Sequence, residues 1–181
     1  KPGNQTALIR AYAGTPTNQD DLVATRCKFD HGKEAVRGNG QYTECDFYKF
    51  SQRVLGTCGP GLRVNKCRFK AGGATNSTIL VQGVDTGNSN QVQIENSVFS
   101  LPKSTHGQAI SLYKDSWQNA LVKNNVFHNC IRAFTFQNNT NGASSTAIGN
   151  DNTTLIVENN LFGQLLQRGR LQRTDGPSSI P

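Results

Sequence analysis

The sequence predicts an all-β solenoid, a parallel β-helix of about six coils, and three observations favour this fold. A short unit ending in phenylalanine recurs six times along the chain. Charged residues make up only 17% of the chain, whereas glycine and asparagine are abundant. Apolar residues at helical spacing are absent from the repeated segments. Low charge with many turn-forming residues disfavours a helical bundle, and one motif at intervals of 18 to 35 residues indicates a solenoid.

Each repeated unit alternates apolar and polar residues, then has a polar or small pair, one further residue and the phenylalanine. This pattern indicates a strand, a tight turn and a return to the core. Coils of a β-helix stack about 4.8 Å apart, so we expect an internal phenylalanine stack and an internal asparagine ladder. The units are LVATRCKF (22–29), QYTECDF (41–47), LRVNKCRF (62–69), VQIENSVF (92–99), ALVKNNVF (120–127) and LIVENNLF (155–162).

A second, looser apolar segment lies between successive units, so each coil should contain at least two short strands. We expect one β-helix domain over residues 1–163, in which 1–20 form the first strand and an N-terminal cap. The Pro-, Gly- and Ser-containing tail, 164–181, is predicted to be a C-terminal cap or linker. The second strands are expected at 34–38, 53–57, 77–84, 108–113 and 131–137.

Charge and targeting signals limit the partners and the location. The net charge is +7, but the basic residues are scattered and are not interleaved with aromatic residues, so we expect no nucleic-acid partner. No apolar run is long enough to span a membrane. Four N-x-S/T sequons, together with the cysteines, favour an extracellular location or a cell or virion surface and allow N-linked glycans. The sequons are at Asn4, Asn76, Asn138 and Asn152.

Three cysteines occupy one position of successive units, two residues before the phenylalanine. Stacked Cα atoms about 5 Å apart lie within the disulfide range. Cys27, Cys45 and Cys67 could therefore form one bridge, with the third thiol free or paired with Cys58. The alternative is that all the cysteines are small core residues. Cys130 is expected to be buried and reduced.

The V/I-x-N-x-x-F units, chiefly VQIENSVF, LVKNNVF and LIVENNLF, resemble those of the right-handed parallel β-helix proteins of the pectate-lyase-like superfamily. The segment TALIRAYAGTP is similar to the first coil of its alginate and chondroitin lyases. That resemblance implies that Lys114 is a catalytic lysine. The corresponding arginine position falls near Gln137, and Arg132 is the nearest arginine in sequence. THGQAIS (105–111) is similar to a stretch of β-helical galacturonases, which implies a role for His106.

Other candidate sites come from charges and aromatic rings. Tyr113 and Trp117 flank Lys114, so these three residues are the predicted glycan contact. We expect no cofactor; calcium is the alternative, if Asp20, Asp21 and Asp46 converge. The basic residues that could line one side of the solenoid are Lys28, Arg68, Lys70, Lys103, Lys114, Lys123 and Arg132.

These observations predict a non-catalytic surface module that binds a polysaccharide or self-associates into a fibre or trimeric spike. The alternative is an enzyme, a polysaccharide lyase or glycoside hydrolase that acts on an acidic polysaccharide.

Overall fold

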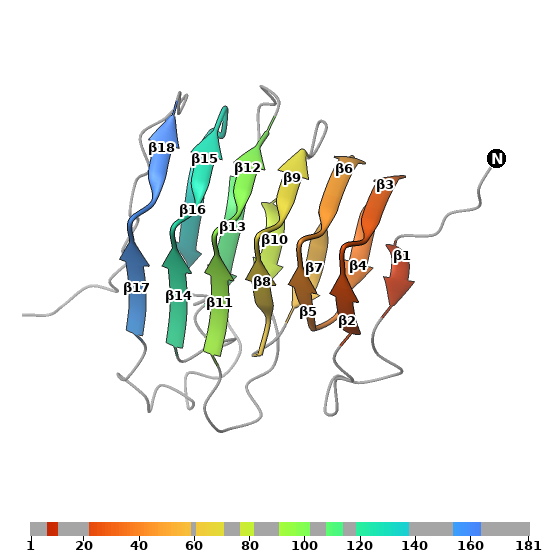
Figure 1. Ribbon diagram of the computed structural model, residues 1–181, viewed down its shortest axis with the longest axis horizontal. Coiled ribbons are helices and arrows are strands. Elements are labelled where there is room, and N and C mark those ends of the chain that lie inside the picture. Colours follow the sequence, from red (N-terminus) through yellow and green to blue (C-terminus); the bar gives the residue numbers. More distant parts are fainter. Residues whose placement is uncertain are drawn as a thin grey trace, which may run out of the picture.

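The computed structural model describes residues 7–10, 22–58, 61–70, 77–81, 91–101, 108–113, 119–137 and 154–163. These residues form eighteen β-strands arranged as three parallel sheets of six strands (Figure 1). In this part of the chain, no helix has the length and apolar character needed to cross a membrane. The predicted tail, 164–181, and most of the predicted N-terminal cap lie outside the described residues.

Every third strand belongs to the same sheet, so each coil contributes one strand to each of three sheets. Sheet A contains β1 (Ala7–Arg10), β4 (Glu34–Arg37), β7 (Leu55–Cys58), β10 (Ser77–Val81), β13 (Gln108–Tyr113) and β16 (Arg132–Gln137). Sheet B contains β2 (Leu22–Thr25), β5 (Gly40–Thr43), β8 (Arg63–Asn65), β11 (Gln91–Glu95), β14 (Asn119–Lys123) and β17 (Thr154–Glu158). Sheet C contains β3 (Lys28–Gly32), β6 (Asp46–Phe50), β9 (Arg68–Lys70), β12 (Val98–Ser100), β15 (Val126–His128) and β18 (Leu161–Gly163).

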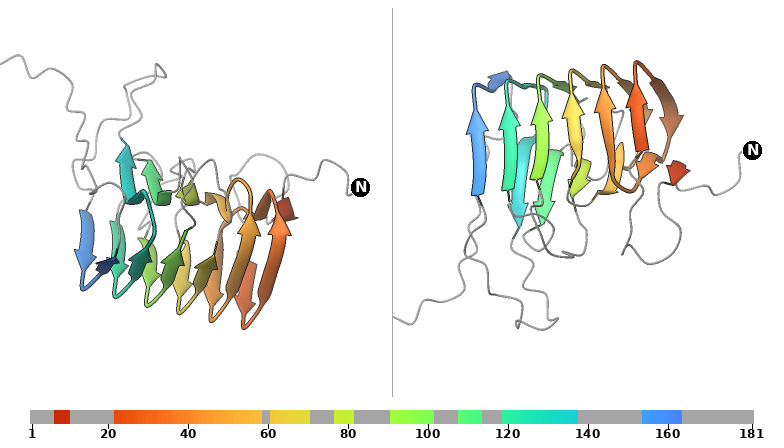
Figure 2. Two further views of the ribbon diagram at one scale, coloured as in Figure 1. Left: turned by 90° about the horizontal axis from the view of Figure 1, so that it is seen from above. Right: turned by 60° about the horizontal axis from the view of Figure 1, so that its bottom comes forward.

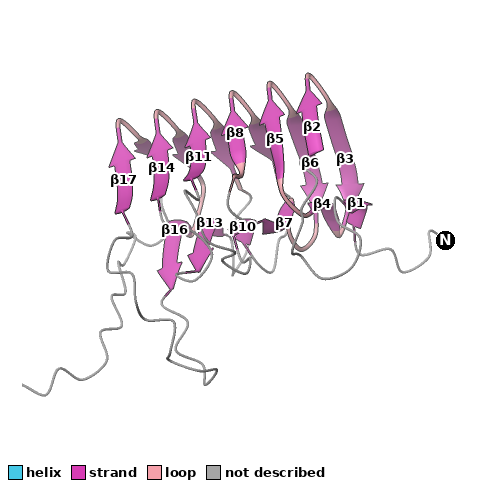
Figure 3. Ribbon diagram, turned by 90° about the horizontal axis from the view of Figure 1, so that it is seen from below, coloured by secondary structure: helices cyan, strands magenta, loops and turns pink. Residues whose placement is uncertain are grey.

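The coils stack along one axis and follow a right-handed path. In Figure 1 the chain rises along the near side through sheets B and C, returns behind through sheet A, and advances by one strand. Figure 2 shows the same coils from above and obliquely, and Figure 3 shows them from below. The predicted parallel β-helix of six coils is therefore confirmed.

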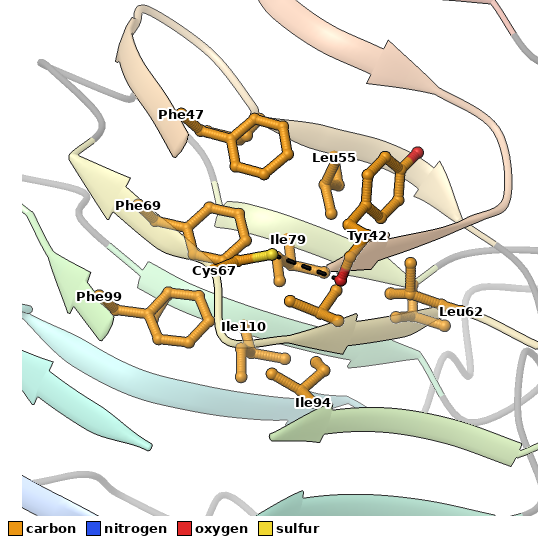
Figure 4. Packing of buried hydrophobic residues seen from close by; sticks show 14 of the residues in the cluster. Tyr42, Phe47, Leu55, Leu62, Cys67, Phe69, Ile79, Ile94, Phe99 and Ile110 are labelled. Atoms are coloured by element: carbon orange, nitrogen blue, oxygen red, sulfur yellow. Dashed lines mark hydrogen bonds between the residues drawn. The ribbon is translucent and has the colours of Figure 1, made fainter. Parts of the chain in front are cut away.

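Strand alternation directs one set of side chains into a continuous core. The phenylalanines that end the repeated units form one stack of nearly parallel rings, with neighbouring centroids 4.6 to 5.4 Å apart. Figure 4 shows three of them, Phe47, Phe69 and Phe99, beside inward aliphatic residues of the other sheets. The predicted phenylalanine stack is confirmed. Its members are Phe29, Phe47, Phe69, Phe99, Phe127 and Phe162.

A two-residue turn joins sheet B to sheet C in every coil. The first residue of this turn has a left-handed backbone, with φ between 49° and 55°. Asparagine adopts this conformation more readily than other non-glycine residues because its side chain can bond the local backbone. Three coils have asparagine here, and the other three have Arg, Glu or Lys. The six residues are Arg26, Glu44, Lys66, Asn96, Asn124 and Asn159.

The second turn residue points inward and connects one coil to the next. Asn125 Oδ1 accepts a hydrogen bond from the Ser97 backbone nitrogen at 2.9 Å, and Asn160 Oδ1 accepts one from Asn125 at 2.8 Å. In the first three coils the same position holds a cysteine. The Cys67 thiol donates to the Tyr42 carbonyl oxygen at 3.4 Å (Figure 4), and Cys45 bonds the preceding coil in the same way. Thiols thus occupy the place that carboxamides take in the last two coils, so the predicted internal asparagine ladder is present there and not in the earlier coils.

Candidate functional site

Few of the candidate site residues predicted from the sequence lie close together in the structure. Arg132, half-buried, begins β16 and pairs in register with Gln108 of β13. Tyr113 ends β13, where its backbone pairs with Gln137. His106, Lys114 and Trp117 lie outside the described residues, as do the sequon asparagines Asn4, Asn76, Asn138 and Asn152.

The strand register of sheet A shows where Arg132 lies relative to the strand end that leads to Lys114. Tyr113, which directly precedes Lys114, pairs with the last residue of β16, whereas Arg132 is the first residue of that strand. Five residues of strand correspond to roughly 16 Å. The backbone of Arg132 therefore lies far from the end of β13 that leads to Lys114. A lysine and an arginine that act on one sugar carboxylate have to converge on it.

Three of the predicted basic residues do share a surface, the outer side of sheet C in the first three coils. We call this surface the Tyr48 face. It consists of two columns in strand register, one with Lys28, Asp46 and Arg68 and the other with Asp30, Tyr48 and Lys70. The predicted basic residue Lys123 lies apart, on sheet B, where it pairs with Glu158 at 3.3 Å.

Tyr48 lies between two lysines that belong to the coils on either side. The Lys28 Nζ atom is 5.3 Å from the ring centroid, and the Lys70 Nζ atom is 5.9 Å from it. Both distances are within the cation–π range of about 6 Å. The ring is therefore held between two ammonium groups on an open surface, where Lys28 and Lys70 are both exposed.

Arg68 neutralises the carboxylate of Asp46, which lies in the neighbouring column of the Tyr48 face. Its Nε and Nη2 atoms bond the two Asp46 oxygens at 2.5 and 2.6 Å. Hydrogen bonds from Arg68 lower the pKa of Asp46 below its usual value, so Asp46 is ionised at neutral pH. Asp30 is contacted by His31 Nδ1 at 2.7 Å and by Lys28 Nζ at 3.6 Å. Lys70 forms no ion pair with a described residue, so its charge is available to an anion.

Tyr48 was missed from sequence although a signal for it exists. The repeat alignment stopped at the phenylalanine, and Tyr48 is the next residue after Phe47. Extending the alignment by one position places Asp30, Tyr48 and Lys70 in one column, which is the register that β3, β6 and β9 adopt.

The calcium alternative finds no site in the described part of the chain. Asp20 and Asp21 lie outside it, and both Asp46 oxygens bond Arg68. No three His, Cys, Asp or Glu side chains gather as metal ligands among the described residues.

Four of the cysteines carry free thiols in this structure. Cys45, Cys67 and Cys130 are buried, as predicted for Cys130, and Cys27 is exposed on the first coil. Burial raises the pKa of Cys67 and of Cys130 to about 12. A bridge between Cys27, Cys45, Cys67 or Cys58 stays a prediction.

Comparisons with known proteins do not place the chain in a family: no family model, no curated protein and no solved structure matches it.

Proposed function

We propose that this chain is a non-catalytic extracellular surface module, part of a fibre or spike, that binds a long acidic glycan along its Tyr48 face. The observation that carries the proposal is the Tyr48 ring between Lys28 and Lys70. The half-buried Tyr48 ring offers the accessible part of an apolar plane to the C–H face of a sugar. Ammonium groups on both sides suit a carboxylated or sulfated residue stacked on that plane.

The geometry of the solenoid suits a polymer better than a single sugar. Lys28 and Lys70 belong to the first and third coils, so the two cations lie two coil spacings, roughly 10 Å, apart along the solenoid axis. An acidic glycan aligned with this axis would meet a charge at each end of the ring. The +7 net charge would add a long-range attraction that draws such a polymer to the protein.

The repeat motif and the three-sheet coil support membership of the pectate-lyase-like superfamily, and the four sequons support an extracellular location. A superfold of this kind hosts both enzymes and binding proteins. The proposed function therefore depends on the Tyr48 face and not on the fold.

Binding to alginate, chondroitin sulfate and polygalacturonate, measured by calorimetry against neutral dextran, tests the proposal. We expect an acidic glycan to bind with an affinity that falls as salt rises. Tyr48→Ala and Lys70→Ala should each weaken binding about tenfold, which is about 1.4 kcal/mol. Lys66→Ala is the matched control because Lys66 is an exposed lysine on the B–C turn, away from the Tyr48 face. No binding to any acidic glycan, or equal losses in all three variants, would refute the proposal.

The alternative is a polysaccharide lyase, supported by the likeness around Lys114 and opposed by the position of Arg132. Incubation with the same three polysaccharides distinguishes the two functions. Unsaturated products that form rapidly and disappear with Lys114→Ala would establish the enzyme, because β-elimination leaves a conjugated double bond that absorbs ultraviolet light.

A further inference from the structure

The last coil leaves core residues exposed that every earlier coil buries. Phe162 ends the ring stack and is 42% exposed, whereas Phe127, one coil before it, is 0% exposed. Val157 is 39% exposed, whereas its register partner Val122 is 1% exposed. The core columns of sheets B and C therefore continue to an open face, which we call the terminal face. It comprises β17 and β18.

In the first coil, the corresponding core residues of sheets B and C are buried. Phe29, at the other end of the stack, is 9% exposed, and Ala24, in the column of Val157, is 6% exposed. At this end, Ile9 of β1 in sheet A is 37% exposed, and Cys27 of the B–C turn is exposed as well. The phenylalanine column and the column of Val157 are thus buried at the first coil and open at the last coil.

The two ends of the solenoid also differ in charge. β17 and β18 carry one ionisable side chain, Glu158, and Lys123 already pairs with it at 3.3 Å. The first coil carries Arg26, Lys28 and Lys33 against Asp30 in its described B and C segments. Arg26 pairs with Glu44 at 3.1 Å and Lys28 with Asp30 at 3.6 Å, so Lys33 is the one cation among these described residues without an ion pair, and its charge would disfavour contact between two first coils. Two terminal faces can meet without uncompensated charge, so the terminal face suits a copy of itself.

The strand edges favour the same partner. β17 and β18 are the last strands of their sheets, and each has a neighbouring described strand on one side alone. Unpaired edge groups readily accept another strand. A two-fold axis perpendicular both to the solenoid axis and to β18 reverses the direction of that strand, so the β18 strands of the two copies would run antiparallel, which is a stable pairing. Such a contact is isologous and closes after two copies.

We propose that two copies of this chain associate end to end through their terminal faces and form a closed, symmetric dimer. The Phe162 ring of each copy then covers that of the other and continues the stack across the two-fold axis. This inference does not depend on glycan binding, because the Tyr48 face lies on the outer side of the first three coils. A dimer of this kind would present two Tyr48 faces at its far ends.

Sedimentation equilibrium of the full chain, from low micromolar to submillimolar concentration, tests the proposal. We expect the mass to rise to a plateau at twice 19.7 kDa. Val157→Lys places two ammonium groups in the contact and should raise the dimer dissociation constant at least tenfold. Val23→Lys is the matched control, because Val23 is 67% exposed on the first coil and is absent from the proposed contact.

A second variant distinguishes loss of the dimer contact from misfolding of the last coil. Leu161→Lys changes an outward position, 64% exposed, in the column that holds Lys28 and Arg68 in other coils. The fold therefore tolerates a cation there, and the rim charge should weaken the dimer severalfold while the circular dichroism spectrum stays unchanged. A monomer at every concentration, as expected if residues 164–181 cover the terminal face, would overturn the proposal. So would a mass that exceeds two copies together with equal loss of association in Val23→Lys, because a head-to-tail polymer uses both ends.

Discussion

The carboxamide of Asn125 joins two coils from inside the solenoid: its Oδ1 atom accepts a hydrogen bond from the Ser97 backbone nitrogen at 2.9 Å. Its Nδ2 atom donates to the Ile94 carbonyl oxygen at 2.8 Å. Asn125 is 1% exposed, so water cannot replace these bonds. Asn125→Leu should lower the free energy of unfolding by about 2–4 kcal/mol, because it leaves two buried backbone groups unsatisfied. Urea unfolding measures this loss. Asn119→Ala, at an exposed strand position, should change stability by less than about 0.5 kcal/mol, and equal losses would contradict the ladder.

The left-handed turn residue predicts a stabilising substitution. Lys66 has a φ of 53°, a conformation that costs roughly 1 kcal/mol for most residues and less for asparagine. Lys66→Asn should therefore raise the unfolding free energy by about 0.5–1 kcal/mol in thermal or urea unfolding. The lost contact with Glu44, 3.8 Å long and exposed, is worth little. The same change at Lys70, in a β-strand, should give no gain. A gain in stability at both positions would show that the removal of a positive charge, and not the backbone conformation, causes the effect.

Replacing a phenylalanine of the stack should lower the free energy of unfolding by an amount that depends on the position of the ring in the stack. Phe99 is 0% exposed between two parallel rings, so Phe99→Ala should cost about 3–5 kcal/mol. Phe162 is 42% exposed and has one ring neighbour in the stack, so Phe162→Ala should cost about half as much. Chemical denaturation of the two variants at one low protein concentration, where the proposed dimer is dissociated, compares them directly. Equal costs would mean that the terminal coil is as well packed as the interior.

The buried thiols predict a loss of stability in alkali. Burial raises the pKa of Cys67 from 9.0 to about 12, so the folded chain keeps the proton where the unfolded chain has released it. The unfolded state then binds fewer protons, and the free energy of unfolding falls as pH rises from 9.0 toward about 12. Stability curves at neutral pH and in this window measure the fall.

Cys67→Ser is the matched variant for this effect. The same column already holds Ser97, so a hydroxyl fits the position, and it does not ionise in this range. The alkaline fall in stability should be smaller in this variant than in the parent chain. An unchanged pH dependence would show that other groups, such as tyrosines and lysines, account for it.

The repeat made the core of the fold predictable. Phe29 through Phe162 and the turn residues before them recur at fixed offsets, because each coil must place the same kinds of side chain inside. The third sheet was harder to foresee. β9 and β12 have three residues each, too few to show an alternating pattern, and their outward residues range from Arg68 to Val98.

The candidate site was only partly predictable for a related reason. Lys28, Tyr48 and Lys70 lie about twenty residues apart in sequence, and none belongs to a local motif. They meet because the coils stack in register, so their proximity follows from the fold and not from spacing. The resemblance drew attention instead to Lys114, whose likeness rests on local sequence.

The constant length of the two-residue B–C turn limits where the sequence can gain or lose residues. That corner has the same length in every coil, because one inserted residue would turn the inward side chains of the following C strand outward. The connection from sheet A to sheet B instead spans two residues at 38–39 and sixteen at 138–153. Insertions and deletions should therefore accumulate at the A–B corner while the B–C corner stays fixed in length. A foreign peptide grafted between Gln137 and Thr154 should leave the coil register intact, which makes this corner the natural place to engineer a new specificity.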